Sequence, residues 1–286
     1  MLFRQTVVFS LCLVFTMLAT PIEKAAAANL EEILVKQSAE TRARYDARHP
    51  QQTLEFFGIK PGMTVIEALP GGGWYSKILI EYLGPEGLLI GADYAHAMYP
   101  KFNFYSAEYI EKKKTWARDW TLGALKWHAN QGASVSAFPF GSMTDDVVGK
   151  VDAVLLIRAT HNLARYENDG GYLTTALKEI YRALKPGGIV GIVQHQAPES
   201  ASDEWASGNN GYLKKSFVIA SFEKNGFVLD GESAINENPA DQPTENDVVW
   251  RLPPTLYTSA DDPALREQMQ SIGESNRMTL RFRKPK

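Results

Sequence analysis

Residues 65–74 read VIEALPGGGW, and this stretch decides the fold. Its first residues form a short apolar run that predicts a buried strand, and the pattern over 73–83 predicts a helix that ends at Gly84. Three successive glycines lie between them, where they permit positive φ and let a ligand approach the backbone N–H groups. The N-terminal end of the following helix suits an anionic group. We therefore expect this loop to hold a nucleotide-type cofactor.

Strand and helix signals alternate along the rest of the chain. Seven apolar runs predict strands, at 63–69, 88–92, 133–138, 151–157, 189–193, 227–233 and 278–282. Helical patterns lie between many of them, at 73–83, 105–120, 170–184 and 212–225. This alternation is typical of βαβ units, and nearly continuous apolar strands fit a sheet that is covered on both faces. The sequence therefore predicts one α/β domain over 29–286, built on a mostly parallel sheet.

Two helices are expected ahead of the first strand. Asn29 can cap a helix over 29–48, and two glutamates in its first turn suit the positive helix end. Pro50 begins a second helix, which ends at Gly58. Towards the other end of the chain, residues 236–258 are rich in Asn, Pro and Asp. They predict an irregular excursion, which is either a lid over the site or a plain surface loop.

Residues 1–28 have the three-part pattern of a secretory signal peptide. Arg4 supplies the positive region, 6–19 is an apolar run that is short for a membrane span, and small residues lead up to Ala28. We expect cleavage after Ala28 and a periplasmic or secreted mature protein without a stable membrane span; an uncleaved membrane anchor is the alternative. Cys12 is the only cysteine, so a chain cleaved after Ala28 has no disulfide and no cysteine nucleophile.

The composition favours a protein that handles small molecules. The formal net charge is −3, whereas binding to nucleic acid needs a basic face, so no nucleic-acid partner is expected. The lysine run at 112–114 predicts a solvated helix face rather than a phosphate-binding patch. The sequence carries no signal for an oligomeric state.

Two acidic residues, Glu67 and Asp93, stand at the carboxyl ends of the first two predicted strands. Open α/β sheets bind ligands at this edge, and an acidic residue after the second strand reaches the ribose hydroxyls of a nucleotide. The alternative for Asp93 is a helix cap or turn residue. A dinucleotide loop would read G-x-G-x-x-G, but Ser76 stands at the third glycine position. A nicotinamide cofactor is therefore disfavoured.

The loop E-x-x-P-G-x-G instead resembles motif I of the class I S-adenosylmethionine-dependent methyltransferases. Residues 151–155 resemble the fourth strand of that superfamily, and LKPGG at 184–188 resembles the turn before its fifth. A narrower resemblance is to bacterial predicted methyltransferases, many with signal sequences, in PGGGW at 70–74, R-x-x-H-N at 158–162 and H-x-A at 195–197. The loop departs from the superfamily at Leu69, which replaces its first glycine.

This resemblance implies a Rossmann-like three-layer α/β/α sandwich whose mostly parallel seven-stranded sheet has an antiparallel last strand. It implies S-adenosylmethionine as the cofactor. Glu67 would contact the methionine amino group, the glycines would let the backbone approach the donor, and Asp93 would hold the ribose hydroxyls. Tyr94 would flank the adenine, whose amino group would lie near 142–143. The implied cofactor-binding residues are Glu67, Pro70, Gly71, Gly73, Asp93, Tyr94, Ser142 and Met143.

Methyl transfer from a sulfonium requires the protein mainly to orient the acceptor and, for an O–H or N–H acceptor, to remove a proton. Candidate residues follow the fourth and fifth predicted strands. His161 is the first choice for a base because histidine titrates near neutral pH, Asn162 would orient a polar group of the substrate, and His195 is the second choice. Either histidine is alternatively a hydrogen-bonded residue of the crevice. No metal is expected, because the two histidines lack a third ligand.

The preferred hypothesis is S-adenosylmethionine-dependent methyl transfer to a small molecule that the sequence does not specify. The alternative is a non-catalytic ligand-binding or accessory protein on a methyltransferase scaffold, because a fold does not guarantee its chemistry and the donor is a cytoplasmic metabolite. A nicotinamide-dependent oxidoreductase ranks third.

Overall fold

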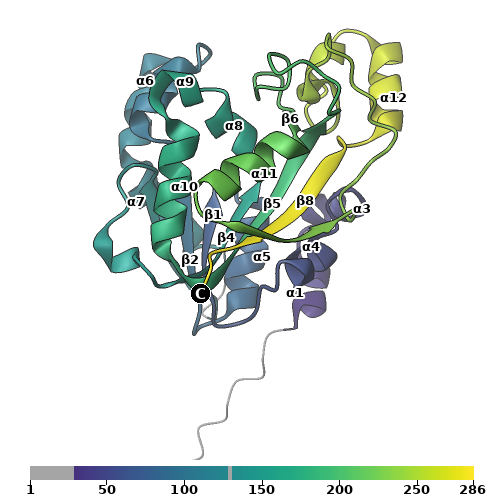
Figure 1. The fold of residues 1–286 in the computed structure, drawn as a ribbon. Coiled ribbons are helices and arrows are strands. Elements are labelled where there is room, and N and C mark those ends of the chain that lie inside the picture. The colour runs from purple at the N-terminus through teal and green to yellow at the C-terminus, as the bar shows by residue number, and fades with distance from the viewer. Residues whose placement is uncertain (1–28, 128–130) are drawn as a thin grey trace, which may run out of the picture.

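A computed structural model describes residues 29–127 and 131–286, so the expected signal peptide lies outside the described residues. The centre of the fold is a sheet in which the strands follow the order β3-β2-β1-β4-β5-β8-β7, with the short β6 beside β5 (Figure 1). The strands are β1 Thr64–Ala68, β2 Leu88–Asp93, β3 Ser134–Pro139, β4 Val151–Ile157, β5 Leu184–Ala197, β6 Leu213–Lys214, β7 Val228–Ser233 and β8 Arg277–Arg283. Of these strands, β8 alone runs in the direction opposite to the others, and it pairs antiparallel with both β5 and β7. The prediction of a mostly parallel sheet with an antiparallel last strand is confirmed.

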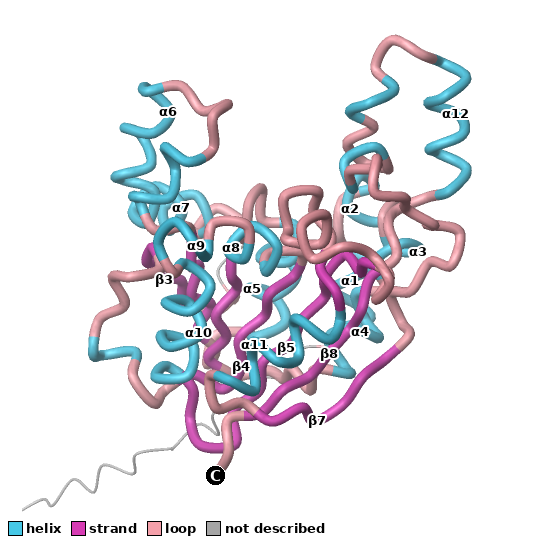
Figure 2. Tube along the Cα trace, turned by 45° about the horizontal axis from the view of Figure 1, so that its top comes forward, coloured by secondary structure: helices cyan, strands magenta, loops and turns pink. Residues whose placement is uncertain are grey.

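Helices cover both faces of the sheet and complete a three-layer sandwich (Figures 1 and 2). One face carries α1 Leu30–Lys36, α4 Pro50–Phe56, α5 Trp74–Leu83 and α7 Trp116–Ala124. The other carries α8 Thr160–Ala164, α10 Tyr172–Ala183 and α11 Lys215–Lys224. Successive residues of a strand point to opposite faces, so Val65 of β1 joins the apolar cluster under the first set of helices and Ile66 joins the second. The alternation in the sequence thus accounts for the two buried layers.

The single helix predicted over 29–48 is wrong in its continuity. The segment forms α1, α2 Ala39–Arg42 and α3 Tyr45–Arg48. Asn29 does cap α1, accepting a hydrogen bond from the Glu31 N–H at 3.0 Å. The break follows α1 because the Ser38 side chain accepts from the Thr41 N–H and so begins a new helix, an alternative to helical hydrogen bonding that serine readily offers.

The helix predicted over 105–120 is also divided. It forms α6 Ala107–Lys112, the 3-10 turn η2 Lys113–Thr115 and α7, and η1 His96–Lys101 precedes it. The lysine run lies at this change of geometry. Lys112 and Lys114 pair with glutamates at the surface, as predicted, whereas Lys113 turns inward to Asp93. The solvated-face prediction is therefore wrong for Lys113.

Two strand boundaries also differ from the predictions. The turn expected at 184–188 lies inside β5, where Gly187 has φ 79° and the register against β4 shifts. The helix expected over 212–225 begins only at Lys215, because residues 213–214 pair with β5 as β6.

The irregular excursion expected over 236–258 is part of a longer segment, residues 234–276, which we call the excursion. It holds η4 Val249–Arg251, η5 Tyr257–Ser259 and α12 Pro263–Ile272. The buried carboxylate of Asp241 anchors it, accepting from Arg251 Nη2 at 2.6 Å, the Tyr212 hydroxyl at 3.1 Å and the Asn276 N–H at 2.9 Å. Within the described part of the chain, no helix is long and apolar enough to cross a membrane.

Candidate functional site

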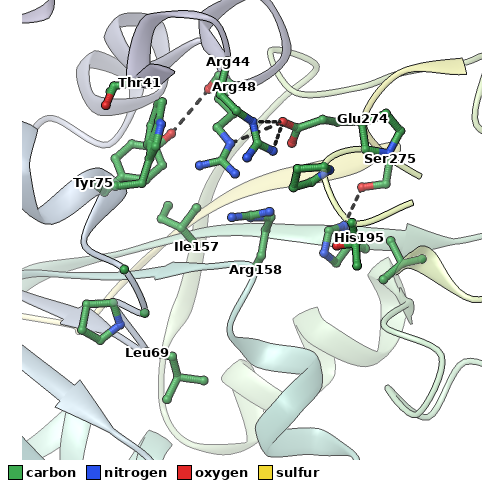
Figure 3. Close-up of a pocket in the computed structure, with 18 of the residues that line it drawn as sticks. Thr41, Arg44, Arg48, Leu69, Tyr75, Ile157, Arg158, His195, Glu274 and Ser275 are labelled. Atoms are coloured by element: carbon green, nitrogen blue, oxygen red, sulfur yellow. Dashed lines mark hydrogen bonds and ion pairs between the residues drawn. The ribbon is translucent and has the colours of Figure 1, made fainter. Parts of the chain in front are cut away.

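A cavity of about 490 Å³ lies at the carboxyl edge of β1, β4 and β5. The glycine loop after β1 forms one wall, and residues just beyond β4 and near the carboxyl end of β5 form the floor. The N-terminal helices and the excursion, through residues 249–255 and 274–275, close the remaining sides (Figure 3). The excursion therefore covers the site rather than forming a plain surface loop. Of the predicted site residues, the cavity brings together Glu67, Pro70, Gly71, His161, Asn162 and His195.

The glycine loop keeps a left-handed backbone at the position where its first glycine is replaced. Leu69 has φ 53°, and its N–H donates to the Ala92 carbonyl at 2.6 Å. Gly71 has φ 55° and lines the cavity. A leucine in this conformation costs about 1–2 kcal/mol relative to glycine. Leucine in place of glycine at position 69 therefore adds strain and a side chain, but the backbone keeps the left-handed conformation that a glycine would adopt there.

Gly73 has a different reason to be glycine from the one predicted. It does not line the cavity, and a Cβ at its position would lie 2.7 Å from Cζ3 of Trp127. Its φ of 77° also suits glycine. The packing of the Trp127 ring thus explains this residue without a ligand.

Glu67 is buried at the inner end of the loop. The Ser76 hydroxyl on α5 donates to its Oε2 at 2.5 Å. Burial raises the pKa of Glu67 to about 8, against the lowering effect of that hydrogen bond. The side chain is therefore largely protonated at neutral pH in the ligand-free protein, and a ligand cation would favour its ionised form.

His161 lies in the first turn of α8, and its hydrogen bonds determine its tautomer. The amide nitrogen of Gln194 faces the carbonyls of His195 and Gly211, so its Oε1 is the atom that accepts from the His161 N–H at 3.2 Å. The same Oε1 lies 3.1 Å from Nδ1 of His161, which must then be the protonated ring nitrogen. Nε2 is left with its lone pair. Burial lowers the pKa of His161 to about 4, so the ring is neutral at pH 7 and a weaker base than predicted from the ordinary value.

His195 lies beside His161, with 5.4 Å between the ring centroids. Its Nδ1 is 2.5 Å from the Ser275 hydroxyl, a contact marked in Figure 3. Burial, together with the neighbouring His161 and arginines, holds the pKa of His195 well below its usual value. Asn162 is half-buried on the same floor. The two rings therefore present neutral, polar edges to the cavity.

Asp93 lies in a separate hollow of about 180 Å³ that shares no lining residue with the main cavity. Its Oδ2 accepts from the Tyr99 hydroxyl at 2.6 Å and from Lys113 Nζ at 2.9 Å. Tyr94 packs against Tyr99 and Phe102, with ring centroids 5.5 and 5.1 Å away. The carboxylate expected to hold a ribose is thus already engaged by protein groups.

Residues 142–143 also lie outside both hollows. The Ser142 hydroxyl donates to the Pro139 carbonyl at 2.7 Å, and the Met143 N–H donates to the Glu179 carboxylate at 3.1 Å. Met143 belongs to the apolar cluster under α8 and α10. Glu179 thereby holds the loop after β3 in place.

The sequence interpretation missed the arginines and the acid that form the upper wall of the cavity, namely Arg44, Arg48 and Glu274. Arg44 Nε donates to Glu274 Oε1 at 2.8 Å across 230 positions of sequence (Figure 3). The local signal was an arginine-rich stretch at 42–48, but only the folded chain shows what these side chains face. Arg158, part of the predicted R-x-x-H-N pattern, rises from the end of β4 towards them.

No group of three or more His, Asp or Glu side chains within residues 29–127 and 131–286 is arranged to hold a metal ion. Comparison with solved structures identifies the fold. A chain from the complex of the Trm112 methyltransferase activator with a methyltransferase of Haloferax volcanii matches at 17% identity and a TM-score of 0.50, covering 92% of this chain and 100% of that one. A S-adenosylmethionine-dependent methyltransferase of Aquifex aeolicus matches at 17% identity and 0.45, covering 73% and 93%.

No protein-family profile matches the sequence, and no curated protein matches it either. The structural similarity, with the strand order of the sheet, establishes a Rossmann-like fold. At this identity the similarity defines the architecture alone, so the activity has to be argued from the site.

Proposed function

We propose that the protein transfers a methyl group from S-adenosylmethionine to a small-molecule acceptor bound in the cavity. One observation carries the proposal: a cavity of small-molecule size opens on the loop after β1, in the methyltransferase fold, and the loop keeps its left-handed turn at Leu69 although the glycine is gone. Strain that is retained at a ligand-binding edge favours a functional role for the loop shape.

The methionine end of the donor suits the residues of the main cavity. Glu67 lies at the inner end, where the donor's ammonium group would favour its ionised form. Gly71 presents backbone without a side chain. Glu67 and Gly71 would hold this half of the donor, which supplies an electrophilic methyl group on a sulfonium.

The adenosine end does not fit the chain as it stands. Lys113 and Tyr99 occupy the carboxylate of Asp93, and the Tyr94 ring is packed among other aromatic rings. Binding of the whole donor would require the Asp93–Lys113 pair to open.

The residues around the acceptor side can orient it and exclude water. His161 is fixed by Gln194 with Nε2 as an acceptor, so it can receive a hydrogen bond from an acceptor O–H or N–H and take the proton as that group becomes acidic on alkylation. The excursion residues Trp250 and Leu252 wall the cavity from solvent. We therefore assign His161 both tasks, orienting the acceptor through a neutral ring and receiving its proton, the second of which is the role predicted from the sequence.

Calorimetry of the chain 29–286 with S-adenosylhomocysteine tests the proposal. We expect binding that weakens at least tenfold in Glu67→Gln, whereas Glu81→Gln, the same change on helix α5 outside the cavity, leaves it unchanged. Absence of binding by the unaltered chain at about millimolar ligand would refute the proposal.

The engaged state of Asp93 favours a second candidate, a ligand-binding or accessory protein that has kept the scaffold without the chemistry. It predicts that ligands enter the main cavity while S-adenosylhomocysteine does not bind. Small-molecule binding with no methyl transfer across an acceptor panel would favour it.

The expected export of the chain is a separate proposal that rests on the pattern of residues 1–28. N-terminal sequencing of the protein recovered from the periplasm or medium should give Asn29 as the first residue. Retention of Met1 on a membrane-bound product would support the uncleaved anchor instead.

A further inference from the structure

The upper wall of the cavity is a cluster of guanidinium groups around one carboxylate. Arg44 and Arg48 come from the N-terminal helices and Arg158 from the end of β4, and all three line the cavity. Arg277, at the start of β8, lies outside the lining and joins the cluster through its contact with Glu274. Glu274 is the acid among them. We call these five residues the arginine wall.

Within the arginine wall, three arginines share the single carboxylate. Arg44 Nε donates to Oε1 of Glu274 at 2.8 Å, Arg277 Nη1 donates to Oε2 at 3.2 Å, and Arg48 Nε lies 3.5 Å from Oε1. Burial opposes ionisation of Glu274, but Arg277, Arg48 and Arg44 outweigh it and hold its pKa below the usual value. The acid is therefore ionised and fully used by these three partners.

Arg158 is the one arginine of the wall that does not contact Glu274. Among the described residues its side chain makes no hydrogen bond and no ion pair, and its Nε is buried without a partner. Burial lowers its pKa, but a guanidinium keeps its proton at neutral pH. Its side chain lines the cavity and points to the Arg48–Glu274 pair (Figure 3). Glu274 attracts this cation without contacting it, while Arg277 and Arg44 repel it. A cation beside a cavity without a contact partner is costly to the ligand-free fold and suits a ligand that brings the missing charge.

The other titratable groups facing the cavity do not supply that charge. Glu40 is exposed, and Glu67 faces Ser76 with its pKa raised to about 8. His161 and His195 are neutral, and Lys77 adds a further positive charge. The cavity therefore carries an excess of positive charge, which favours an anion.

We propose that the arginine wall binds the carboxylate of a small organic acid, with Arg158 as its principal partner. A guanidinium presents two parallel N–H donors that match the two oxygens of a carboxylate. The aromatic side chains of Trp74 and Trp250 line the same cavity and suit an apolar or aromatic body, and Nε2 of His161 accepts a hydrogen from a hydroxyl or amino group. The ligand is thus a carboxylic acid that also carries an O–H or N–H donor.

As a statement about the methyl acceptor, this inference rests on the proposed function; as a statement about binding, it does not. If Arg158 holds the carboxylate and His161 binds the O–H or N–H of the same acid, that O–H or N–H group lies on the floor of the cavity, beside the site that Glu67 offers to S-adenosylmethionine. In that case the enzyme would methylate a hydroxy or amino acid at the hydroxyl or amine.

The test is a thermal-shift and calorimetric panel of hydroxybenzoates, aminobenzoates and aliphatic hydroxy acids, each beside its uncharged amide, with no donor present. At least one acid should bind tenfold or more tightly than its amide, and the difference should disappear in Arg158→Gln. Arg158→Lys, which keeps the positive charge but not the two parallel N–H donors, should retain part of the difference in affinity. Arg118→Gln, at an exposed arginine of α7, should leave it intact. The proposal would be overturned if no acid bound more tightly than its amide, or if Arg158→Gln kept the same preference for the acid.

A stability readout guards against a merely structural role for Arg158. Since its charge has no contact partner, Arg158→Gln should be at least as stable as the parent in the absence of ligand. A variant that unfolds more readily and loses binding for that reason would contradict the assignment, and so would partner groups appearing for Arg158 in a ligand-free crystal structure.

Competition separates the acid site from the donor site. The acid and S-adenosylhomocysteine should bind together, with neither displacing the other; mutual exclusion would show that the arginine wall serves the donor and would overturn the acceptor assignment. Binding of the acid without S-adenosylhomocysteine would retain the acid site and reject methyl transfer. Binding of S-adenosylhomocysteine without any acid would do the reverse.

Discussion

Leu69 and Arg158 adopt the same left-handed backbone conformation just beyond the carboxyl ends of the neighbouring strands β1 and β4. Their φ angles are 53° and 56°. Each N–H donates to a carbonyl of the next strand at 2.6 Å, that of Leu69 to Ala92 and that of Arg158 to Val193. Both chains thus turn off the sheet in the same way, and both turns line the cavity. The strained positions coincide with the part of the molecule to which we assign ligand binding.

Strain at Leu69 should reverse the usual order of alanine and glycine. Both Leu69→Ala and Leu69→Gly lose the packing of the side chain, but only glycine relieves the left-handed strain. We expect Leu69→Gly to be more stable than Leu69→Ala by about 1 kcal/mol in urea unfolding. At Lys77, in helix α5, the same pair should show the ordinary order, with alanine more stable by about 1 kcal/mol. Alanine ahead of glycine at both positions would contradict the assigned conformation.

Gly73 and Gly72 form a matched pair for testing the Trp127 contact. A methyl group at Gly73 would overlap the indole ring and would sit at φ 77°, whereas at Gly72 it would meet nothing within 4 Å. We expect Gly73→Ala to lower the free energy of unfolding by about 1–3 kcal/mol and Gly72→Ala to change it by less than about 0.5 kcal/mol. Equal effects in chemical denaturation would indicate that the ring does not pack there.

The raised pKa of Glu67 predicts a pH dependence of stability. The folded protein holds this proton up to about pH 8, whereas the unfolded chain releases it near 4.5, so the native state binds more protons in that window. The stability of the parent relative to Glu67→Gln should fall as pH rises from about 5 to about 8, by at most about 1.4 kcal/mol per unit, and then level off. Denaturation at several pH values measures it; a difference independent of pH would mean that Glu67 is ionised in the fold.

The lowered pKa of His161 predicts that stability changes with pH in the opposite direction. Its folded pKa of about 4 lies below the ordinary 6.5, so between these values the unfolded chain binds the extra proton. The stability of the parent relative to His161→Gln should therefore be lost as pH falls from about 6.5 to about 4. A ring that titrates near 6.5 by NMR in the folded protein would contradict both the burial effect and the assigned tautomer.

Features that depend on local sequence patterns could be predicted, whereas features that depend on long-range contacts could not. Strand β1, the loop and α5 were predictable because apolar periodicity and successive glycines are local signals. The same signals could not tell that Gly73 faces Trp127 rather than the cavity. The arginine wall was out of reach, since Arg44 meets Glu274 only through the fold. Asp93 was placed correctly at its strand end, but nothing in its surroundings in the sequence indicated that Lys113, 20 positions later, would pair with it.

The pairing of Lys113 with Asp93 gives the sharpest test of how the adenosine end of a donor would be admitted. If ribose hydroxyls are to reach the Asp93 carboxylate, they must displace Lys113 Nζ, which lies 2.9 Å from Oδ2. Removing this competitor should therefore tighten the binding of S-adenosylhomocysteine, and we expect a gain of about three- to tenfold in Lys113→Met, the scale of a partly buried ion pair. Lys112→Met provides the matched control, because Lys112 is exposed and pairs only with Glu108 at the helix surface. Calorimetry of the three proteins compares the affinities. Weaker binding in Lys113→Met would make Lys113 a ligand-binding residue, and no change would mean that the donor does not use Asp93.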